Sequence, residues 1–164
     1  MFRKRFRLGK LWGATFAAAL LLPSCASLTL EQVDYAWPVE SVLTVQENNI
    51  VTEGRHALTF NVAPLAEKEF NNPNALIGKQ IRLLRNTSGY YFVTGPKFKY
   101  VYVMAPKAGE LTLYSRLEVS KEGLKKPALN QRLPYVELLD AGSVRLLLTS
   151  DDIFEPQDLR AEGR

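Results

Sequence analysis

The chain has 164 residues, of which 46% are hydrophobic and 23% charged, and it holds a single cysteine. This composition excludes a disordered chain, and one cysteine excludes a scaffold of internal disulfides. The formal net charge of +4 comes from the first 24 residues, which hold five of the 21 basic residues and no acid. The remainder, with 16 basic and 17 acidic residues, is nearly neutral, so its charge does not predict nucleic-acid binding.

The first 24 residues have the pattern of a secretory signal peptide. A cationic stretch that ends at Lys10 is followed by an apolar run of 12 residues, from Leu11 to Leu22. A membrane-spanning helix needs about 20 apolar residues, so this run is too short to span a bilayer. The sequence therefore predicts export, with residues 1–24 removed on processing.

The end of this segment, Leu22-Pro23-Ser24-Cys25, resembles the lipobox of bacterial lipoproteins. The resemblance covers about the first 25 residues and implies that Cys25 becomes an acylated N-terminus, which anchors the chain to a membrane. Ala26 stands where an aspartate commonly retains such proteins in the inner membrane, which implies the outer membrane, facing the periplasm or the cell surface. The alternative is cleavage after Ala26, which would leave a soluble periplasmic protein without cysteine.

After the signal, residues 25–38 are interpreted as a tether, residues 39–154 as one β domain and residues 155–164 as a flexible tail. Within the domain, short runs rich in Val, Leu, Tyr, Phe and Thr between turn residues predict eight strands. These strands cover residues 41–46, 56–62, 80–85, 90–94, 98–105, 110–119, 135–139 and 144–150. Short glycine-containing connections make neighbouring strands antiparallel, so the middle four strands form a meander.

One short helix is expected over Pro64 to Phe70, since proline suits a first helical position and Pro73 follows the end of the run. Residues 120–134 are expected to form a long polar connection. The predicted fold is therefore mainly β, an antiparallel meander that forms a small sandwich or barrel of about seven or eight strands, with one short helix.

The alternation within strands predicts which faces are buried. The strand at 110–119 places its apolar residues Leu111, Leu113, Leu117 and Val119 on one face, which indicates one solvent-exposed side. The strands at 90–94 and 98–105 are apolar on both faces and must be covered on both sides, by a sandwich, a small closed barrel or the helix.

Few residues of this sequence suit catalysis, and no catalytic residue, metal site or cofactor is predicted. The lone His56 is expected to be a structural residue at the end of a strand, and no second histidine or free thiol accompanies it. Two acid pairs, Glu67 with Glu69 and Asp151 with Asp152, lie in polar stretches where solvation explains them better than acid catalysis or cation binding.

Aromatic residues are concentrated between positions 90 and 102, which hold six of the 13 aromatics outside the signal. Phe92 and Val101 are expected in the core. Tyr91 or Tyr100 is expected to be partly exposed and to contact a ligand, with Lys97, Lys99 and Lys107 at the rim of that face. The basic residues of the connection at 120–134 are a weaker candidate for an anionic partner; they are Lys121, Lys125, Lys126 and Arg132.

The sequence thus favours a membrane-anchored protein of the cell envelope with a non-enzymatic binding or structural role. Its expected partners are the membrane, through the N-terminal lipid, and an envelope protein, glycan or lipid. Two alternatives stay open, namely an envelope enzyme that acts on glycans through carboxylates and a carrier of a lipid or other hydrophobic ligand.

Overall fold

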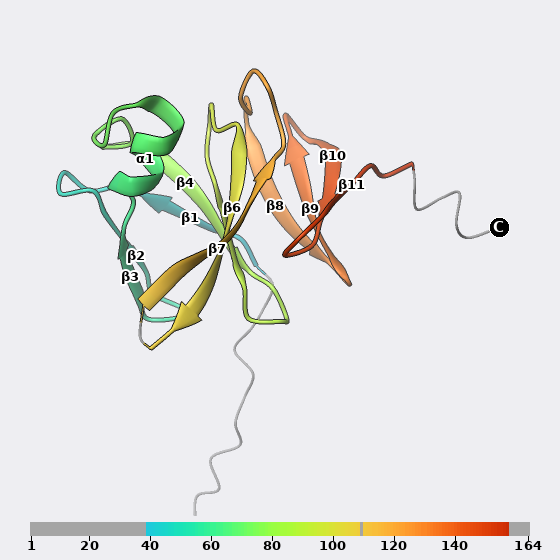
Figure 1. Cartoon of the computed structure of the whole chain (residues 1–164), viewed down its shortest axis with the longest axis horizontal. Helices are drawn as coiled ribbons and strands as arrows, with labels where there is room; N and C mark the ends of the chain where they lie inside the picture. Colours follow the sequence, from blue (N-terminus) through green and yellow to red (C-terminus); the bar gives the residue numbers. More distant parts are fainter. Residues whose placement is uncertain (1–38, 109, 158–164) are drawn as a thin grey trace, which may run out of the picture. The chain divides into compact units, whose positions relative to one another are not determined.

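The computed structural model describes residues 39–108 and 110–157, so the expected signal, the expected acylation site and the expected tether lie outside the described residues (Figure 1). The fold is mainly β, as predicted, with eleven strands in antiparallel sheets and one short helix. The strands are β1 (Ser41–Thr44), β2 (Ile50–Glu53), β3 (Leu58–Asn61), β4 (Gln80–Arg85), β5 (Tyr91–Thr94), β6 (Tyr100–Lys107), β7 (Glu110–Glu118), β8 (Pro127–Arg132), β9 (Tyr135–Asp140), β10 (Ser143–Leu148) and β11 (Ile153–Phe154).

Three of these strands were not expected from the sequence. They are β2, β8 and β11, which raise the strand count above the predicted seven or eight. The segment at 120–134 is therefore not a polar connection throughout, because β8 pairs antiparallel with β9 along its whole length. Leu129 of β8 is buried, but few apolar residues flank it in the sequence. The apolar alternation that would predict a strand is therefore weak in this segment.

The helix α1 (Ala63–Phe70) agrees with the predicted helix within one residue. Proline lies in its first turn, where the missing N–H has no intrahelical partner to lose. It ends at Asn71, which adopts a left-handed conformation and donates its backbone N–H to the Glu67 carbonyl at 2.9 Å. The helix buries Leu65 and Ala66, which fixes it against the first core.

The central sheet has the strand order β1-β4-β5-β6-β7, and the predicted meander of four strands, β4 to β7, is confirmed. Both faces of its middle strands are covered, as the apolar alternation requires. Tyr91, Val93 and Tyr102 lie in a first core with α1 and the hairpin β2-β3. Phe92 and Val101 lie in a second core, so the expectation that these two residues are buried is confirmed.

The second core is closed by a four-stranded sheet of order β11-β10-β9-β8, which contributes Leu129, Val136, Leu138 and Leu148. The two larger sheets therefore form a sandwich around this core. The Glu40 carboxylate ties them together, because it accepts the Leu129 N–H at 2.7 Å and pairs with Arg82 at 3.1 Å. In the part of the chain that the structure describes, no helix has the length and hydropathy to cross a membrane.

A bulge in β7 changes the faces that the sequence predicts for this strand. Val103 of β6 is opposite Ser115, while the next residue, Met104, is opposite Leu113, so Tyr114 is the extra residue. Beyond the bulge, Leu117 and Val119 belong to the second core, whereas Leu111 packs against the first. The prediction of one apolar face along the whole strand is therefore wrong, and Leu113 is 43% exposed.

The loop between β7 and β8 packs closely on the turn between β5 and β6. Gly123 has a φ of +91°, and a Cβ at this position would lie 2.6 Å from the Lys97 carbonyl oxygen. The Lys97 N–H donates to the Leu124 carbonyl at 2.6 Å. Glycine suits position 123 because it tolerates the positive φ and has no Cβ to clash with Lys97. This close contact holds the loop in place, where it forms one wall of a polar pocket.

Candidate functional site

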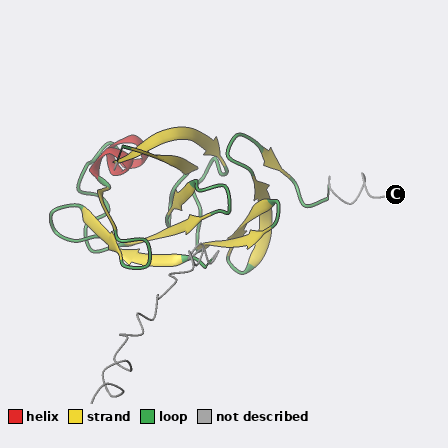
Figure 2. Ribbon diagram, turned by 90° about the horizontal axis from the view of Figure 1, so that it is seen from below, coloured by secondary structure: helices red, strands yellow, loops and turns green. Residues whose placement is uncertain are grey.

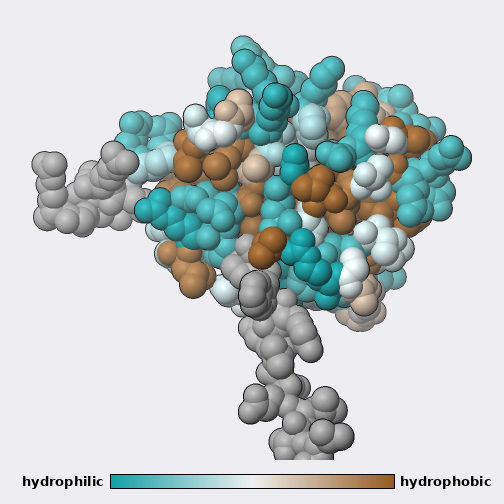
Figure 3. Space-filling view, turned by 180° about the vertical axis from the view of Figure 1, so that it is seen from behind, coloured by the Kyte–Doolittle hydropathy of each residue, from teal (hydrophilic) through white to brown (hydrophobic). Residues whose placement is uncertain are grey.

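An apolar groove lies between β3 and the first half of β7, with α1 at one end. Its volume is about 550 Å³, which falls within the usual range for ligand sites. The apolar side chains that line it come from β3, α1, β6 and β7 and are Leu58, Phe60, Pro64, Leu65, Met104, Leu111 and Leu113. The view from behind in Figure 3 shows apolar residues reaching the surface in separate places among polar ones. Scattered apolar residues are normal on a protein surface, whereas this groove gathers them around one hollow.

The apolar part of the lining comes mainly from alternate residues of β3 and of the first half of β7. In β3, Leu58 and Phe60 pack against the first core while Thr59 and Asn61 are exposed. In β7, Leu111 packs against the same core. The floor of the groove is therefore continuous with the first core.

Two charged side chains stand at the rim of the groove, Lys68 of α1 and Glu110 at the start of β7. Neither forms an ion pair with another described residue. The site thus combines an apolar floor with the polar Thr59 and Asn61 of β3, one cation at its helical end and one acid where β7 begins. It has no histidine, and among the described residues no group of three potential metal ligands exists.

The groove interrupts a ring of seven strands. Around the first core the strands follow the order β3-β2-β1-β4-β5-β6-β7. Figure 2, seen from below, shows strands and loops that surround an oval ring. Although β1 and β2 belong to different sheets, the Ser41 hydroxyl reaches Glu53 and the Gln46 N–H donates to the Ile50 carbonyl, so these strands run antiparallel. No described strand pairs with the outer edges of β3 and β7 beside the groove, and the ring is open there.

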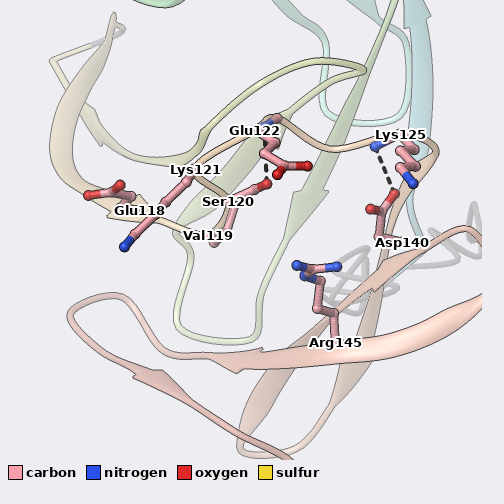
Figure 4. Close-up of a pocket in the computed structure, with 9 residues that line it drawn as sticks. Glu118, Val119, Ser120, Lys121, Glu122, Lys125, Asp140 and Arg145 are labelled. Carbon is pink, nitrogen blue, oxygen red and sulfur yellow. Dashed lines mark hydrogen bonds between the residues drawn. The ribbon is translucent and has the colours of Figure 1, made fainter.

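A second, polar pocket of about 600 Å³ lies between the β7–β8 loop and the edge of the β9-β10 hairpin (Figure 4). Arg145 points toward the loop that carries Glu122 and Lys125. Asp140 accepts the backbone N–H groups of Lys125 and Lys126 at 3.0 and 2.7 Å, which fixes the loop.

Three acids balance three bases around this polar pocket: Glu118, Glu122 and Asp140, with Lys121, Lys125 and Arg145. The balance does not favour an anionic ligand. Arg132, which the sequence grouped with these lysines, pairs instead with Glu137 at 2.9 Å. That pair and the Asn130 amide lower the pKa of Glu137 although burial alone would raise it.

The predicted ligand-contact residues do not form one site. Tyr91 is 7% exposed, so the expectation of partial exposure is wrong for it, because its ring packs edge-on against His56 in the first core. Tyr100 is half-buried beneath Arg116, whose guanidinium carbon lies 4.4 Å from the ring centre. Ligand contact at Tyr100 stays a prediction.

The three lysines expected at one rim lie at two places. Lys97 and Lys99 are exposed beside the start of β6, whereas Lys107 ends the same strand. An eight-residue strand is about 26 Å long, so Lys107 belongs to a different edge. Ligand contact at Lys97 and Lys99 stays a prediction, and neither residue lines the apolar groove.

His56 lies in the turn before β3, and its buried side chain agrees with a structural role. Its ring nitrogen Nδ1 is 3.0 Å from a carboxylate oxygen of Glu53, and the Ser41 hydroxyl donates to the other oxygen at 2.9 Å. The glutamate therefore stands between the serine and the histidine. A serine activated by histidine would need a direct contact between those two residues, which the structure does not provide.

The acid pairs also serve structural contacts. Glu69 accepts the backbone N–H groups of Lys99 and Tyr100 at 3.0 and 3.1 Å, which ties α1 to the start of β6. Asp151 accepts the Tyr114 hydroxyl at 2.9 Å, and this hydrogen bond raises the pKa of Tyr114 to about 12. These contacts explain one member of each pair without a reaction.

The sequence does not indicate the groove residues as a group. The alternation around Leu111 and Leu113 predicted an apolar strand face, but nothing local indicates that this strand and the one predicted at 56–62 flank one opening. The expected acylation site, Cys25, lies outside the described residues. Searches with this chain match no protein-family model, no curated protein and no solved structure.

Proposed function

We propose that this protein is a lipid-anchored, non-enzymatic binding protein of the cell envelope, and that it holds the apolar part of a ligand in the groove between β3 and β7. The observation that carries the proposal is the apolar lining of a groove of about 550 Å³ with a single cation and a single acid at its rim. Such a site contributes binding energy by removing apolar surface from water, about 0.8 kcal/mol per buried CH₂ group.

A hydrocarbon chain with a charged end suits this site best. The chain would cover Phe60, Leu111 and Leu113, and Lys68 lies where an anionic end group could pair with it. This favours the carrier of a hydrophobic ligand among the functions that the sequence left open. For the glycan-cleaving alternative no comparable support exists, since no aromatic side chain lines the pocket that holds several acids.

The ligand proposal predicts a loss of binding when a charge enters the groove. We expect Leu113→Asp to weaken the binding of 11-(dansylamino)undecanoic acid at least about tenfold, since a carboxylate opposes burial of an apolar chain beside it. Fluorescence titration of the chain that begins at Ala26 measures this affinity. The matched control is Val144→Asp on β10, because Val144 is 40% exposed and Leu113 is 43% exposed. Equal affinities for the parent and Leu113→Asp would refute the proposed site.

The anchoring proposal predicts acylation at Cys25. Protein extracted from membranes is expected to lack residues 1–24 and to carry added lipid mass. The added mass should correspond to more than one acyl chain, because a single chain binds a bilayer only marginally. Cys25→Ala is expected to leave the precursor unprocessed. Intact-mass spectrometry measures both results, and an unmodified mature chain that begins at Ser27 would show ordinary secretion instead.

A further inference from the structure

Two strand edges flank the groove, and no described strand pairs with either of them. They belong to β3 and to the first half of β7, before the bulge at Tyr114. Neighbouring strands of the ring are antiparallel, so β1, β3, β5 and β7 run one way while β2, β4 and β6 run the other. In Figure 1 both β3 and β7 run upward from the lower side of the view, where the start of β7 lies beside β3. One strand placed between them would run antiparallel to both.

The backbone of β3 directs unpaired hydrogen-bonding groups to the groove. Val62, directly after β3, donates its N–H to the Asn49 carbonyl at 2.9 Å, and these two residues lie opposite each other in the register of β2 and β3. Hydrogen bonds to an antiparallel partner come from every second residue, here counted back from Val62. The N–H and C=O groups of Thr59 and Asn61 therefore face away from β2. Both residues line the groove.

The edge of β7 directs the same kind of groups to the groove from the other side. Pro106 of β6 lies opposite Leu111. Proline has no N–H, so this pair cannot exchange two hydrogen bonds, and the bonds between β6 and β7 come from the residues on either side of it. The backbone groups of Glu110 and Thr112 therefore face β6. Those of Leu111 and Leu113 face the groove.

A hydrocarbon chain leaves these backbone groups to water, whereas an extended peptide bonds to them. Successive residues of a strand direct their N–H and C=O groups to opposite edges, so one peptide strand pairs with both β3 and β7. Every second side chain of that strand lies over the apolar floor, to which Leu65 and Met104 contribute. Eight strands also form a ring whose interior side chains can fill. Unpaired strand edges beside apolar pockets are what strand addition uses.

We infer that the groove accepts an extended segment of a partner protein, which adds as an eighth strand between β3 and β7. The free edges set its length, because β3 has four residues and the free part of β7 runs from Glu110 to Leu113. The segment therefore has four residues in the groove. Its alternate residues are apolar and cover the floor.

The rim charges define the direction and the ends of this segment. Lys68 belongs to α1, which follows the end of β3, whereas Glu110 stands where β7 begins. A strand antiparallel to β3 and β7 enters near Lys68 and leaves near Glu110. Both side chains are exposed, and neither has an ion pair with a described residue. A complementary segment carries an acidic residue at its N-terminal end and a basic residue at its C-terminal end.

A partner strand and the proposed hydrophobic ligand exclude each other, and this part of the inference rests on the proposed function. Both cover the same floor, which includes Phe60 and Leu111. We therefore expect 11-(dansylamino)undecanoic acid to weaken the apparent affinity for the partner segment. Binding of an acyl chain would release the partner.

Fluorescence anisotropy with a fluorescein-labelled, C-terminally amidated peptide tests strand addition. The probe is Asp-Thr-Val-Thr-Val-Lys, and the matched control is the same peptide with its two charged residues exchanged. With the chain that begins at Ala26, we expect the probe to bind several-fold more tightly than the control, since two exposed ion pairs are replaced by two repulsive contacts. The double variant Lys68→Glu with Glu110→Lys is expected to reverse this preference. Val144→Asp on β10 should leave both affinities at the parent level.

Methylation of the peptide backbone separates strand addition from apolar contact alone. Methyl groups on the two valine nitrogens keep every side chain and remove two backbone donors. We expect them to weaken binding at least about tenfold, because the acceptors of the strand edge lose their partners. Equal affinities of the methylated and unmethylated probes would overturn the inference.

Three further results would also overturn it. They are no binding of the probe to the folded chain, a probe that binds no better than the control, and a dimer that dissociates when the probe is added. The dimer would assign the free edges to a second copy of this chain. The proposed function fails separately. If the probe binds but 11-(dansylamino)undecanoic acid does not, strand addition stands and the ligand proposal falls, and the opposite result leaves only the ligand proposal.

Discussion

Phe92→Ala is expected to lower the free energy of unfolding by about 3–5 kcal/mol. Phe92 is fully buried in the second core, and its strand neighbours Leu84 and Val103 lie in the same core. A cavity at this point removes contacts on both sides of the sandwich. Because a domain is stable by only about 5–15 kcal/mol, the loss is a large part of the total. Urea titration followed by circular dichroism measures it.

Two companion variants make this result decisive. Leu133→Ala is expected to change stability by less than about 0.5 kcal/mol, since Leu133 is 67% exposed. Tyr91→Ala is expected to cost several kcal/mol as well, because Tyr91 lies in the first core, on the opposite face of β5. A loss for Phe92→Ala as small as that for Leu133→Ala would contradict the assignment of two covered faces.

Local patterns were sufficient for most elements of the central sheet. The limits of β4 agree with the prediction at both ends, and the expected helix begins one residue early. The apolar alternation on β5 and β6 correctly required two covered faces. These features succeed because strand and helix periodicities are set by neighbouring residues.

Features that depend on distant partners were missed. β8 has one strongly buried leucine, and pairing with β9 makes it a strand. The bulge at Tyr114 reverses the faces of β7 without any glycine or proline to mark it. The groove lies between two strands that do not pair with each other. Apolar alternation indicates a strand and its buried face, but it does not indicate which strand edges stay unpaired. The candidate site therefore could not be predicted from the same signals as the fold.

Glu53→Ala is the second substitution with a large expected effect, about 2–6 kcal/mol of lost stability, because it leaves two buried donors unpaired at about 1–3 kcal/mol each. The Glu53 side chain is 3% exposed and accepts hydrogen bonds from the Ser41 hydroxyl and from the backbone N–H of His56 at 2.9 and 2.7 Å. Removing the carboxylate leaves these two buried donors without their acceptor and takes away the ion-pair partner of Arg55, whose Nε lies 3.6 Å from it. The exposed Glu118→Ala is the control, with an expected change within about 0.5 kcal/mol.

The same carboxylate makes the stability of the domain depend in part on pH. Burial alone raises the pKa of Glu53, but the hydrogen bonds from His56, Ser41 and Arg55 outweigh burial and hold the pKa below its usual value. A carboxyl whose pKa is lower in the folded state stabilises the fold above its unfolded pKa of about 4.3, and this contribution is lost as the pH falls through the folded pKa. The difference in unfolding free energy between the parent and Glu53→Gln should therefore be larger at neutral pH than in acid.

The stability of the Glu53→Gln variant still depends on pH to some extent, because the pKa of Glu137 is also lowered. Urea titrations across this pH range measure the difference, and a value independent of pH would show that the charge of Glu53 does not stabilise the fold.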